Sequence, residues 1–333
     1  MKAWRVHANG EPRDVMRLDD IPEPEPGPGQ LLVRVHAANV NFPDALLCRG
    51  QYQIRPPLPF TPGVEMCAEV LALGEGDAGA TAPGDRVLAS PVLPAGAFAE
   101  YTLADAATVR PAPESLDDAE AAAMHIGYQT GWFGLHRRAR IQPGETLLVH
   151  AAAGGVGSAA VQLGVAAGAR VIGVVGGPDK AAVARDQGCD VVIDRRETDF
   201  VAAVKEATGG RGADVIYDPV GGDAYNRSTK CVAFEGRIII VGFASGDIQT
   251  PPLSHALIKN YTILGLHWGL YNTKDPAAVA ACHEELTKLA AQGAIKPLVS
   301  ERVPLEQAAD AVQRVAAGRT TGRIVVEPSR AGA

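Results

Sequence analysis

Short apolar runs, separated by glycine- and proline-rich turns, characterise the first third of the chain. Residues 30–35, 68–73 and 85–89 have the length and composition of strands. The chain also opens on a strand-like alternation of polar and apolar residues over 1–7. This pattern predicts a mostly β domain of short strands, of the partly open barrel type.

From about residue 115 the pattern changes to an alternation of strands and helices, beginning with a helix that starts within 117–123. Strands rich in Val and Ile are predicted at 145–151, 170–175, 190–194, 213–218 and 237–241. Helices are predicted between them at 156–167, 179–187 and 200–208, with glycines at their ends. Strands that are apolar on both faces and separated by helices indicate an α/β fold with a doubly wound parallel sheet.

After residue 260 the alternation weakens. A strand is predicted at 261–266, long helices at 276–292 and 305–317, and a final strand at 322–327. The 333 residues are enough for two domains of ordinary size.

Composition narrows the classes of protein to consider. The formal charge is −7 and no long basic cluster is present, so we expect no nucleic acid partner. No apolar run is long enough to span a bilayer, and we expect no membrane association. The cysteines number five and are scattered, which is typical of reduced thiols in a cytoplasmic protein.

The turn between the strand at 145–151 and the helix at 156–167 carries the strongest chemical signal. It has the sequence Ala152-Ala-Gly154-Gly155-Val156-Gly157, which matches the dinucleotide fingerprint Gly-x-Gly-x-x-Gly except at Ala152. Gly154 would let the backbone approach a pyrophosphate, and Gly157 would let the helix pack closely on the strand. The free N–H groups at the helix start favour phosphate binding.

The second strand of this unit indicates which dinucleotide binds. An NAD site normally has Asp or Glu at the end of that strand, whereas this chain has Val174-Val-Gly-Gly-Pro178. Lys180 follows, and Arg195 and Arg196 end the next strand, so cations are available for a 2′-phosphate. Asp179 is expected in the first turn of a helix. We therefore predict NADPH (NADP) in preference to NADH.

Several motifs together resemble the quinone oxidoreductase branch of the zinc-type (medium-chain) alcohol dehydrogenase superfamily. They are Asn39-Val-Asn-Phe-Pro-Asp44, Arg49-Gly-Gln-Tyr52, Pro59-Phe-Thr-Pro-Gly-Val-Glu65, Pro83-Gly-Asp-Arg-Val87, His150-Ala-Ala-Ala-Gly-Gly-Val-Gly157 and Tyr217-Asp-Pro-Val-Gly-Gly222. The resemblance extends over essentially the whole chain.

The resemblance implies a GroES-like, mostly β catalytic domain formed by residues 1–121 and 262–333. A Rossmann domain that binds NADP, residues 122–261, would be inserted between these segments. It also implies that Thr130, Gly176 and Phe243 contact the cofactor together with the glycine turn, Lys180 and Arg195. Members of this family are commonly homodimers that pair through the last strands of the inserted sheet, here the segment 261–267.

Relatives that use catalytic zinc have two Cys and a Gly-His-Glu motif at positions where this chain has Asn41, Val64 and Ile126. None of these residues supplies a thiolate or imidazole. The structural zinc lobe of four cysteines is also missing from the sequence. We therefore expect no metal site and no zinc.

Without a Lewis acid, alcohol oxidation is difficult, but an electron-poor acceptor can take a hydride directly. We predict a zinc-independent oxidoreductase that reduces a quinone with NADPH. Asn41 could hydrogen-bond the cofactor or the acceptor, and Tyr52 could stack on the acceptor or donate to it. Local structure is the alternative explanation: Asn41 could cap a turn and Tyr52 could pack in a loop.

Two other functions stay open. The acceptor could be the conjugated carbonyl of an enone or enal, or an enoyl thioester such as an enoyl-CoA. Some members of the superfamily are structural or RNA-binding proteins, and the negative charge argues against that function here.

Overall fold

In the computed structural model, which describes residues 1–76 and 79–329, the chain forms two compact units. The first unit combines Met1–Ile126 with Lys296–Ala333, and the second is Gly127–Ile295. The first boundary falls within helix α3 (Asp118–Trp132). A chain whose two ends form one unit and whose middle forms the other is the arrangement that the sequence predicts.

A seven-stranded sheet forms the first unit, in the order β14-β15-β3-β4-β5-β7 with β6 paired to β3. The C-terminal strand β15 pairs antiparallel with the N-terminal strand β3, opposing Val325 to Asn39. The strands of this sheet are β3 (Gln30–Asn39), β4 (Met66–Leu73), β5 (Arg86–Ala89), β6 (Tyr101–Asp105), β7 (Arg110–Pro111), β14 (Val299–Pro304) and β15 (Arg323–Glu327). A separate antiparallel pair consists of β1 (Lys2–Val6) and β2 (Met16–Asp20).

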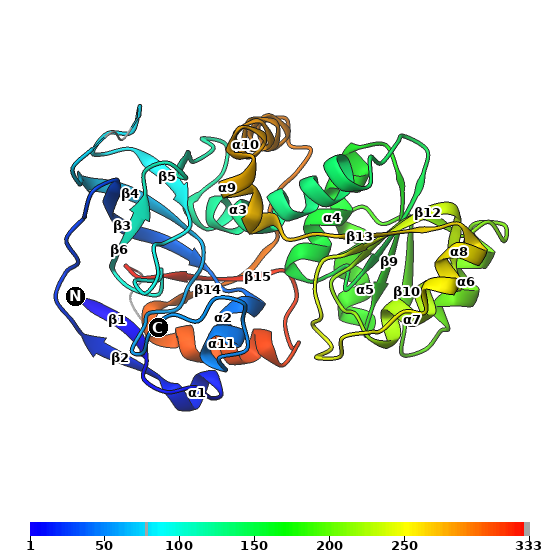
Figure 1. Cartoon of the computed structure of the whole chain (residues 1–333), viewed down its shortest axis with the longest axis horizontal. Helices are drawn as coiled ribbons and strands as arrows, with labels where there is room; N and C mark the ends of the chain where they lie inside the picture. Colours follow the sequence, from blue (N-terminus) through cyan, green and yellow to red (C-terminus); the bar gives the residue numbers. More distant parts are fainter. Residues whose placement is uncertain (77–78, 330–333) are drawn as a thin grey trace. The chain divides into compact units, whose positions relative to one another are not determined.

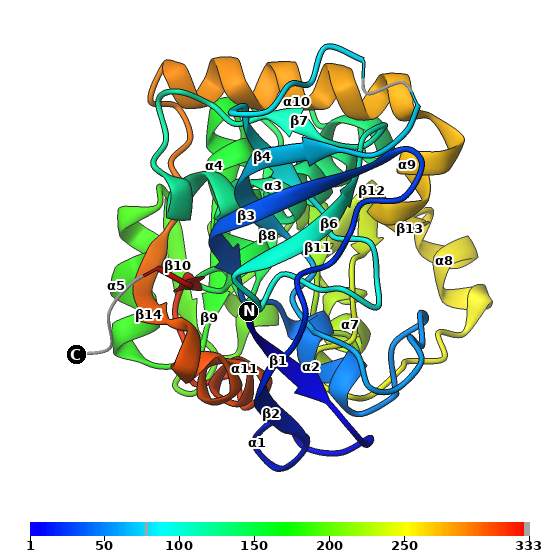
Figure 2. The ribbon, with the colours of Figure 1, turned by 90° about the vertical axis from the view of Figure 1, so that its left-hand side faces the viewer.

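Three helices from opposite ends of the chain pack together in this unit. They are α1 (Pro12–Val15), α2 (Phe42–Cys48) and α11 (Ala308–Ala316), which follows the 3-10 turn η3 (Leu305–Gln307). Figure 2 shows the orange-red α11 beside the blue α1 and α2. Buried side chains of α11 join the same apolar core as those of α2 and of the strands β3 and β4.

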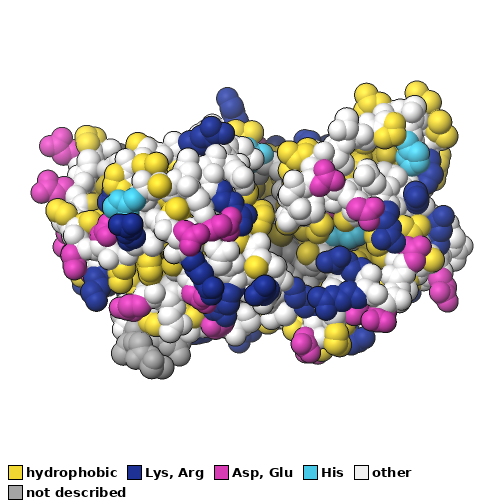
Figure 3. Space-filling model, turned by 90° about the horizontal axis from the view of Figure 1, so that it is seen from below, with side chains coloured by type: hydrophobic (Ala, Val, Ile, Leu, Met, Phe, Trp, Pro, Cys, Tyr) yellow, Lys and Arg dark blue, Asp and Glu magenta, His cyan; other side chains and the backbone are white. Residues whose placement is uncertain are grey.

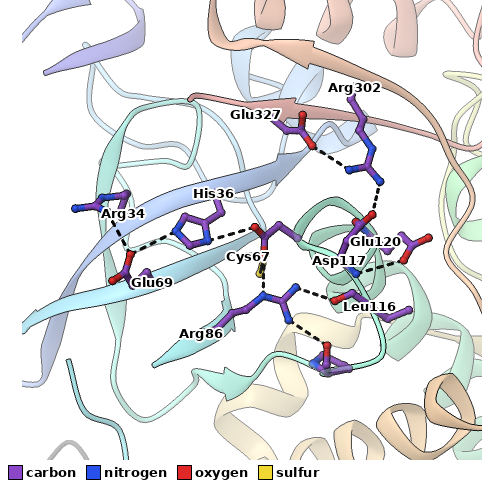
Figure 4. A network of polar contacts seen from close by, with 12 residues as sticks. Arg34, His36, Cys67, Glu69, Arg86, Leu116, Asp117, Glu120, Arg302 and Glu327 are labelled. Atoms are coloured by element: carbon purple, nitrogen blue, oxygen red, sulfur yellow. Dashed lines mark hydrogen bonds and ion pairs between the residues drawn. The ribbon is translucent and has the colours of Figure 1, made fainter. Parts of the chain in front are cut away.

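A polar network ties the C-terminal strands to the start of α3 (Figure 4). Arg302 on β14 bonds Asp117 at 2.5 Å and Glu327 on β15 at 3.2 Å. Arg86 on β5 donates to Asp118 at 2.6 Å and to two backbone carbonyls. The Arg302–Asp117 bond joins residues 185 positions apart and so helps to hold the C-terminal strands in the first unit.

The second unit is built on a six-stranded parallel sheet in the order β10-β9-β8-β11-β12-β13. Helices follow the strands, as Figure 1 shows. The strands are β8 (Thr146–His150), β9 (Arg170–Val175), β10 (Val191–Asp194), β11 (Ala213–Asp218), β12 (Val232–Ile240) and β13 (Thr262–Gly265). The helices are α4 (Gly155–Ala166), α5 (Pro178–Asp186), α6 (Phe200–Ala207), α7 (Asp223–Ser228), α8 (Leu253–Lys259), α9 (Tyr271–Lys274) and α10 (Pro276–Ala291), with the 3-10 turn η2 (Trp268–Leu270) before α9.

The predicted α/β fold class is confirmed, with one mostly β unit and one unit built on a doubly wound parallel sheet. The predicted strands 170–175 and 213–218 have the observed bounds of β9 and β11. Because β8 and β11 are buried along nearly their whole length, their composition alone identifies them.

Three features differ from the sequence analysis. The second break between units lies at Ile295, not near 261, because β13 pairs with β12 and therefore belongs to the parallel sheet. Helix α3 continues as a π-helix, η1 (Phe133–Arg138), a segment for which the sequence predicts no element. Helices α7 and α8 were not predicted. Both have at most seven residues, which are too few to establish an apolar periodicity, and none of the residues of α8 is buried.

Strand β13 is the last strand of the parallel sheet among the described residues, as expected of an edge strand. The five cysteines are free and buried, which fits their predicted role as core thiols. In the described part of the chain, no helix combines the length and apolar character needed to cross a membrane.

Candidate functional site

The glycine turn connects β8 to α4 as predicted, and Gly157 is the residue that fixes its shape. A Cβ at Gly157 would lie 2.1 Å from the carbonyl oxygen of Ala151 and 2.8 Å from its carbon. Only glycine allows the first turn of α4 to approach the end of β8 this closely. The left-handed residue of the turn is Ala151, with a φ of 51°, and Ala152 is fully buried.

Gly154, Gly155 and Val156 form the accessible part of this turn, since they are half-buried and Gly157 is buried. Gly154 is the N-cap of α4, and no side chain caps the helix there. The first N–H groups of a helix have no intrahelical acceptor, and the helix dipole adds positive potential at the same end. The turn can therefore bind an anionic group such as a phosphate.

Cations gather where β9 ends, at the position of the missing acid. A Cβ at Gly176 would lie 3.5 Å from Nε and Nη2 of Arg195 and 3.6 Å from Nε of Arg196. Lys180 completes the group. Burial lowers the pKa of its ammonium, and the charges of Arg196 and Arg195 lower it further. Figure 3 shows a group of Lys and Arg side chains on one face of this unit, in the right-hand half of the view.

Two carboxylates, Asp179 and Asp194, lie near this group in the sequence, and neither occupies the end of β9. Asp179 is exposed in the first turn of α5, as expected, and so is not at the strand end. Asp194, which the sequence analysis did not single out, ends β10 and accepts the N–H of Gly177 at 2.9 Å and of Arg196 at 3.0 Å. The bond from Arg196 is the main reason that the pKa of Asp194 is lowered. Asp194 thus organises the loop that carries the two arginines.

Thr130 and Phe243, the other predicted cofactor contacts, lie in the same unit. Thr130 is buried in α3, next to Gly131, where a Cβ would lie 2.8 Å from Cδ1 of Leu163 on α4. Phe243 follows the carboxyl end of β12 and is 37% exposed. An aromatic ring this exposed is available to a ligand, whereas Thr130 is buried.

Asn41 in the first unit is the N-cap of α2 and lies in a buried polar cluster. Its Nδ2 donates to Glu65 Oε1 at 2.8 Å and to the backbone oxygen of Asn39 at 3.2 Å. Its Oδ1 accepts from Arg323 Nη1 at 2.9 Å and from Asn39 Nδ2 at 3.3 Å. These bonds use both donors and both lone pairs of the amide. A cofactor or acceptor contact would have to replace one of them.

Two of the three positions at which the sequence lacks zinc ligands, Asn41 and Ile126, meet at one carboxylate. Glu65, which is fully buried, accepts from Asn41, from Asn39 and from the backbone N–H of Ile126 at 2.5 Å. Arg323 is buried beside it, with Nη1 at 3.9 Å from Glu65 Oε1. Within residues 1–76 and 79–329, no group of three His, Cys, Asp or Glu residues is arranged to hold a metal ion.

Tyr52 is half-buried and packs on the apolar core of the first unit. Burial raises the pKa of its hydroxyl, and the negative charge of Asp44 adds to the shift. The phenol therefore keeps its proton at neutral pH and can donate a hydrogen bond. Asp44 itself accepts the N–H groups of Asn41 at 2.7 Å and Gly63 at 2.9 Å, so its carboxylate has a structural role.

Sequence reasoning missed Asn39, Glu65 and Arg323 as members of the polar cluster around Asn41. Glu65 stood in a quoted motif, so its position was visible, but its partners were not. Arg323 is 282 residues from Asn41 in sequence. No local pattern could have paired them.

A cavity of about 520 Å³ also lies in the first unit, lined by His36, Asp118, Glu327 and Ser329. It borders the polar network of Figure 4, in which His36 is between Glu69 at 3.5 Å and Asp118 at 3.4 Å. None of the predicted site residues lines it.

Comparison with known proteins agrees with this geometry. Residues 155–284 match the family described as zinc-binding dehydrogenase, and residues 27–114 match the alcohol dehydrogenase GroES-like domain. The chain is 36% identical to mouse (Mus musculus) quinone oxidoreductase-like protein 2 over 324 residues, covering 97% of this chain and 92% of that protein.

Two solved structures extend the comparison. Escherichia coli quinone oxidoreductase, solved in complex with NADPH, is 31% identical with a TM-score of 0.91, covering 98% of this chain and 100% of that one. The CurF ER cyclopropanase of the curacin A biosynthetic pathway is 27% identical with a TM-score of 0.86, covering 98% of each chain.

Proposed function

The chain belongs to the quinone oxidoreductase branch of the medium-chain dehydrogenase superfamily, and from this membership we propose that it reduces a quinone with NADPH, without zinc. The observation that supports the choice of NADPH is the group of Lys180, Arg195 and Arg196 at the end of β9. The E. coli relative, which was solved with NADPH, supports the same choice.

The residues of the second unit fit a 2′-phosphorylated dinucleotide. The uncapped start of α4 offers N–H groups and a positive dipole end to the pyrophosphate. Arg195 and Arg196 lie against Gly176 and Gly177, where a carboxylate would select NAD. Guanidinium groups bind phosphate in bidentate fashion, so this group suits the 2′-phosphate better than a hydroxyl.

When bound, NADPH supplies a hydride to an electron-poor acceptor. The chain itself holds the reactants in position and provides hydrogen bonds to the acceptor oxygen. Tyr52, whose raised pKa keeps it protonated, is the proposed donor. Asn41 remains a proposed contact, one that must exchange one of its four internal bonds.

A second acceptor class is supported by the similarity to the CurF ER cyclopropanase. The conjugated double bond of an enone, an enal or an enoyl thioester can take the same hydride. NADPH would donate the hydride in the same way in both reactions, so only the acceptor distinguishes the two functions.

Oxidation of NADPH, followed by its absorbance, separates these functions. We expect turnover with quinones to exceed that with enones and enoyl thioesters, and turnover with NADPH to exceed that with NADH. A preference for an enoyl thioester would replace the quinone assignment while leaving the cofactor assignment intact. A preference for NADH would contradict the role of the cation group.

Arg195→Gln tests that role directly. Loss of one charged hydrogen bond to phosphate weakens binding by about 1.5–3 kcal/mol, so KM for NADPH should rise roughly tenfold or more, and KM for NADH should not change. Arg185→Gln, an exposed position on α5, is the matched control for the loss of one positive charge.

We also propose that the protein is a homodimer that pairs through the free edge of β13. The support is the edge position of this strand in the parallel sheet.

A further inference from the structure

The motif Tyr217-Asp-Pro-Val-Gly-Gly222 forms a tight turn at the carboxyl end of β11. Asp218 ends β11 and is buried, and its Oδ1 accepts the N–H of Val220 at 2.8 Å and of Gly221 at 3.0 Å. One carboxylate oxygen thus fixes the tight turn after β11. The two glycines that follow are held in one defined conformation.

Both glycines have backbone angles that favour glycine. Gly221 has a φ of 71°, and Gly222 has a φ of 55° with a ψ of −127°. Residues with a Cβ rarely adopt such angles. A turn without positive φ angles could also connect a strand to a helix. The connection alone therefore does not explain why two glycines stand here.

The explanation is the segment 243–249, which lies directly over the two glycines. A Cβ at Gly221 would lie 2.9 Å from Cδ1 of Phe243, and a Cβ at Gly222 would lie 3.0 Å from Oδ2 of Asp247. The backbone of the segment is also bonded to the turn, with the N–H of Ala244 donating to Pro219 at 3.1 Å. The missing side chains make room for this loop.

Gln249 closes the contact from the far end of the loop. Its Oε1 accepts the N–H of Gly222 at 3.0 Å. Residues 243–248 are all exposed, whereas Gln249 is half-buried, because its side chain turns inward to the glycine. The Gly222–Gln249 hydrogen bond therefore fixes the far end of the loop that carries Phe243, while the N–H of Ala244 fixes the near end.

The location of this loop gives it a functional meaning. The chain passes from β8 to β9 and β10 on one side of the sheet and then returns to β11 on the other, so the strand order reverses between β8 and β11. Dinucleotides bind at such a reversal, outside the carboxyl ends of the strands, with one mononucleotide on each side. The cation group at the end of β9 assigns the adenosine half to that side, which leaves the nicotinamide half for the ends of β11 and β12.

We propose that Gln249 is a positioning residue: through its bond to Gly222 it holds the 243–249 loop and Phe243 in place for the nicotinamide half of the cofactor. The proposal rests on the proposed use of NADPH. Gln249 does not itself touch the reacting atoms. By ordering the loop before the cofactor binds, it lowers the conformational entropy that binding would otherwise cost.

Calorimetric titration of Gln249→Met with two ligands tests this role. Methionine has a similar length but no acceptor for the Gly222 N–H. We expect Kd for NADPH to rise about tenfold, the effect of one hydrogen bond, and Kd for 2′,5′-ADP to stay within about twofold. The second ligand contains only the adenosine half and so reports on the β9 side alone.

Two further variants make the result specific. Gln249→Glu keeps an acceptor oxygen and should retain most of the NADPH affinity, whereas Thr250→Val changes the exposed neighbouring residue and should have no effect. In steady-state assays, Gln249→Met should raise KM for NADPH more than it lowers kcat.

An unchanged Kd for NADPH in Gln249→Met would overturn the proposal, and so would an equal loss for both ligands, which would indicate a general structural role. If the unmodified protein itself binds neither NADPH nor 2′,5′-ADP, the proposed function fails instead. The two failures are therefore distinguishable.

Discussion

Asn41 illustrates how a residue that looks catalytic in sequence can be committed to structure. It stands where zinc-dependent relatives have a ligand, and its amide could in principle meet a cofactor. In the fold its two donors and two lone pairs are already used by Asn39, Glu65 and Arg323. A buried carboxylate and a buried guanidinium depend on this amide for their hydrogen bonds.

Asn41→Ala should therefore reduce stability as well as turnover. The sequence alone predicts loss of turnover or of NADPH affinity with little change in stability. Because Glu65 and Arg323 would each lose a buried partner, we expect the free energy of unfolding in urea to fall by about 2–4 kcal/mol. Unchanged stability with reduced turnover would restore the purely catalytic interpretation.

Asp44 gives the first unit a pH dependence. Burial raises the pKa of its carboxyl from 3.8 to about 7, although two N–H donors act in the opposite direction. The folded protein holds this proton more tightly than the unfolded chain does. The stabilisation is therefore complete below pH 4 and is lost as the pH rises through about 7.

We expect the contribution of Asp44 to the free energy of unfolding to fall by about 2–4 kcal/mol between pH 4 and pH 7. Urea unfolding of the protein and of Asp44→Asn across this range measures it. Asparagine does not titrate, so the difference between the two curves isolates this group. Parallel curves would show that Asp44 keeps an ordinary pKa.

At the scale of elements, two glycines at the start of helix α4 have different roles. Gly157 is needed for packing, because a Cβ there would overlap Ala151. Gly154 has an ordinary φ of −89°, and a Cβ there would lie 3.2 Å from the carbonyl oxygen of Ala151, which requires a shift of a few tenths of an ångström. Alanine at 154 therefore disturbs the fold much less than alanine at 157, where the Cβ would lie 2.1 Å from the same oxygen.

The matched variants Gly154→Ala and Gly157→Ala should behave differently. Gly154→Ala should keep its Tm within about 2 °C and raise Kd for NADPH at least tenfold, because the added methyl group faces the bound pyrophosphate. Gly157→Ala should lower the Tm by several degrees, since the helix must move away from the strand. Equal effects of the two substitutions on Tm would contradict this division.

At the scale of the whole molecule, the edge strand β13 is the proposed contact between two copies of the chain in a homodimer. Light scattering should give twice the chain mass of 34.7 kDa. Thr262 is exposed on β13, and Thr262→Lys should shift the population toward monomer, because charge on an edge strand disfavours pairing. A monomeric unmodified protein would remove β13 from consideration as an interface.

Much of this architecture could be predicted from local pattern. Strand β9 is a run of Val and Ile broken only at Gly173, and β11 has the apolar centre Val215-Ile216-Tyr217, so both can be bounded from the sequence. The glycine turn was recognised because its residues are adjacent in sequence. Helix α8 is not predicted because its seven residues are too few to establish a helical period, and its apolar residues Leu253, Leu257 and Ile258 are exposed.

The sequence by itself determined the order of strands and helices, the phosphate-binding turn and the lack of an acid at the strand end formed by Val174 and Val175. Each of these features depends only on residues that are neighbours in the sequence. Only the tertiary structure decided which distant groups meet. Arg323 reaches Asn41, the loop of Arg195 folds against Gly176, and Gln249 reaches Gly222. The physical reason is that hydrogen bonds and charges act over a few ångströms in space, and the path of the chain between such residues leaves no periodic trace in the sequence.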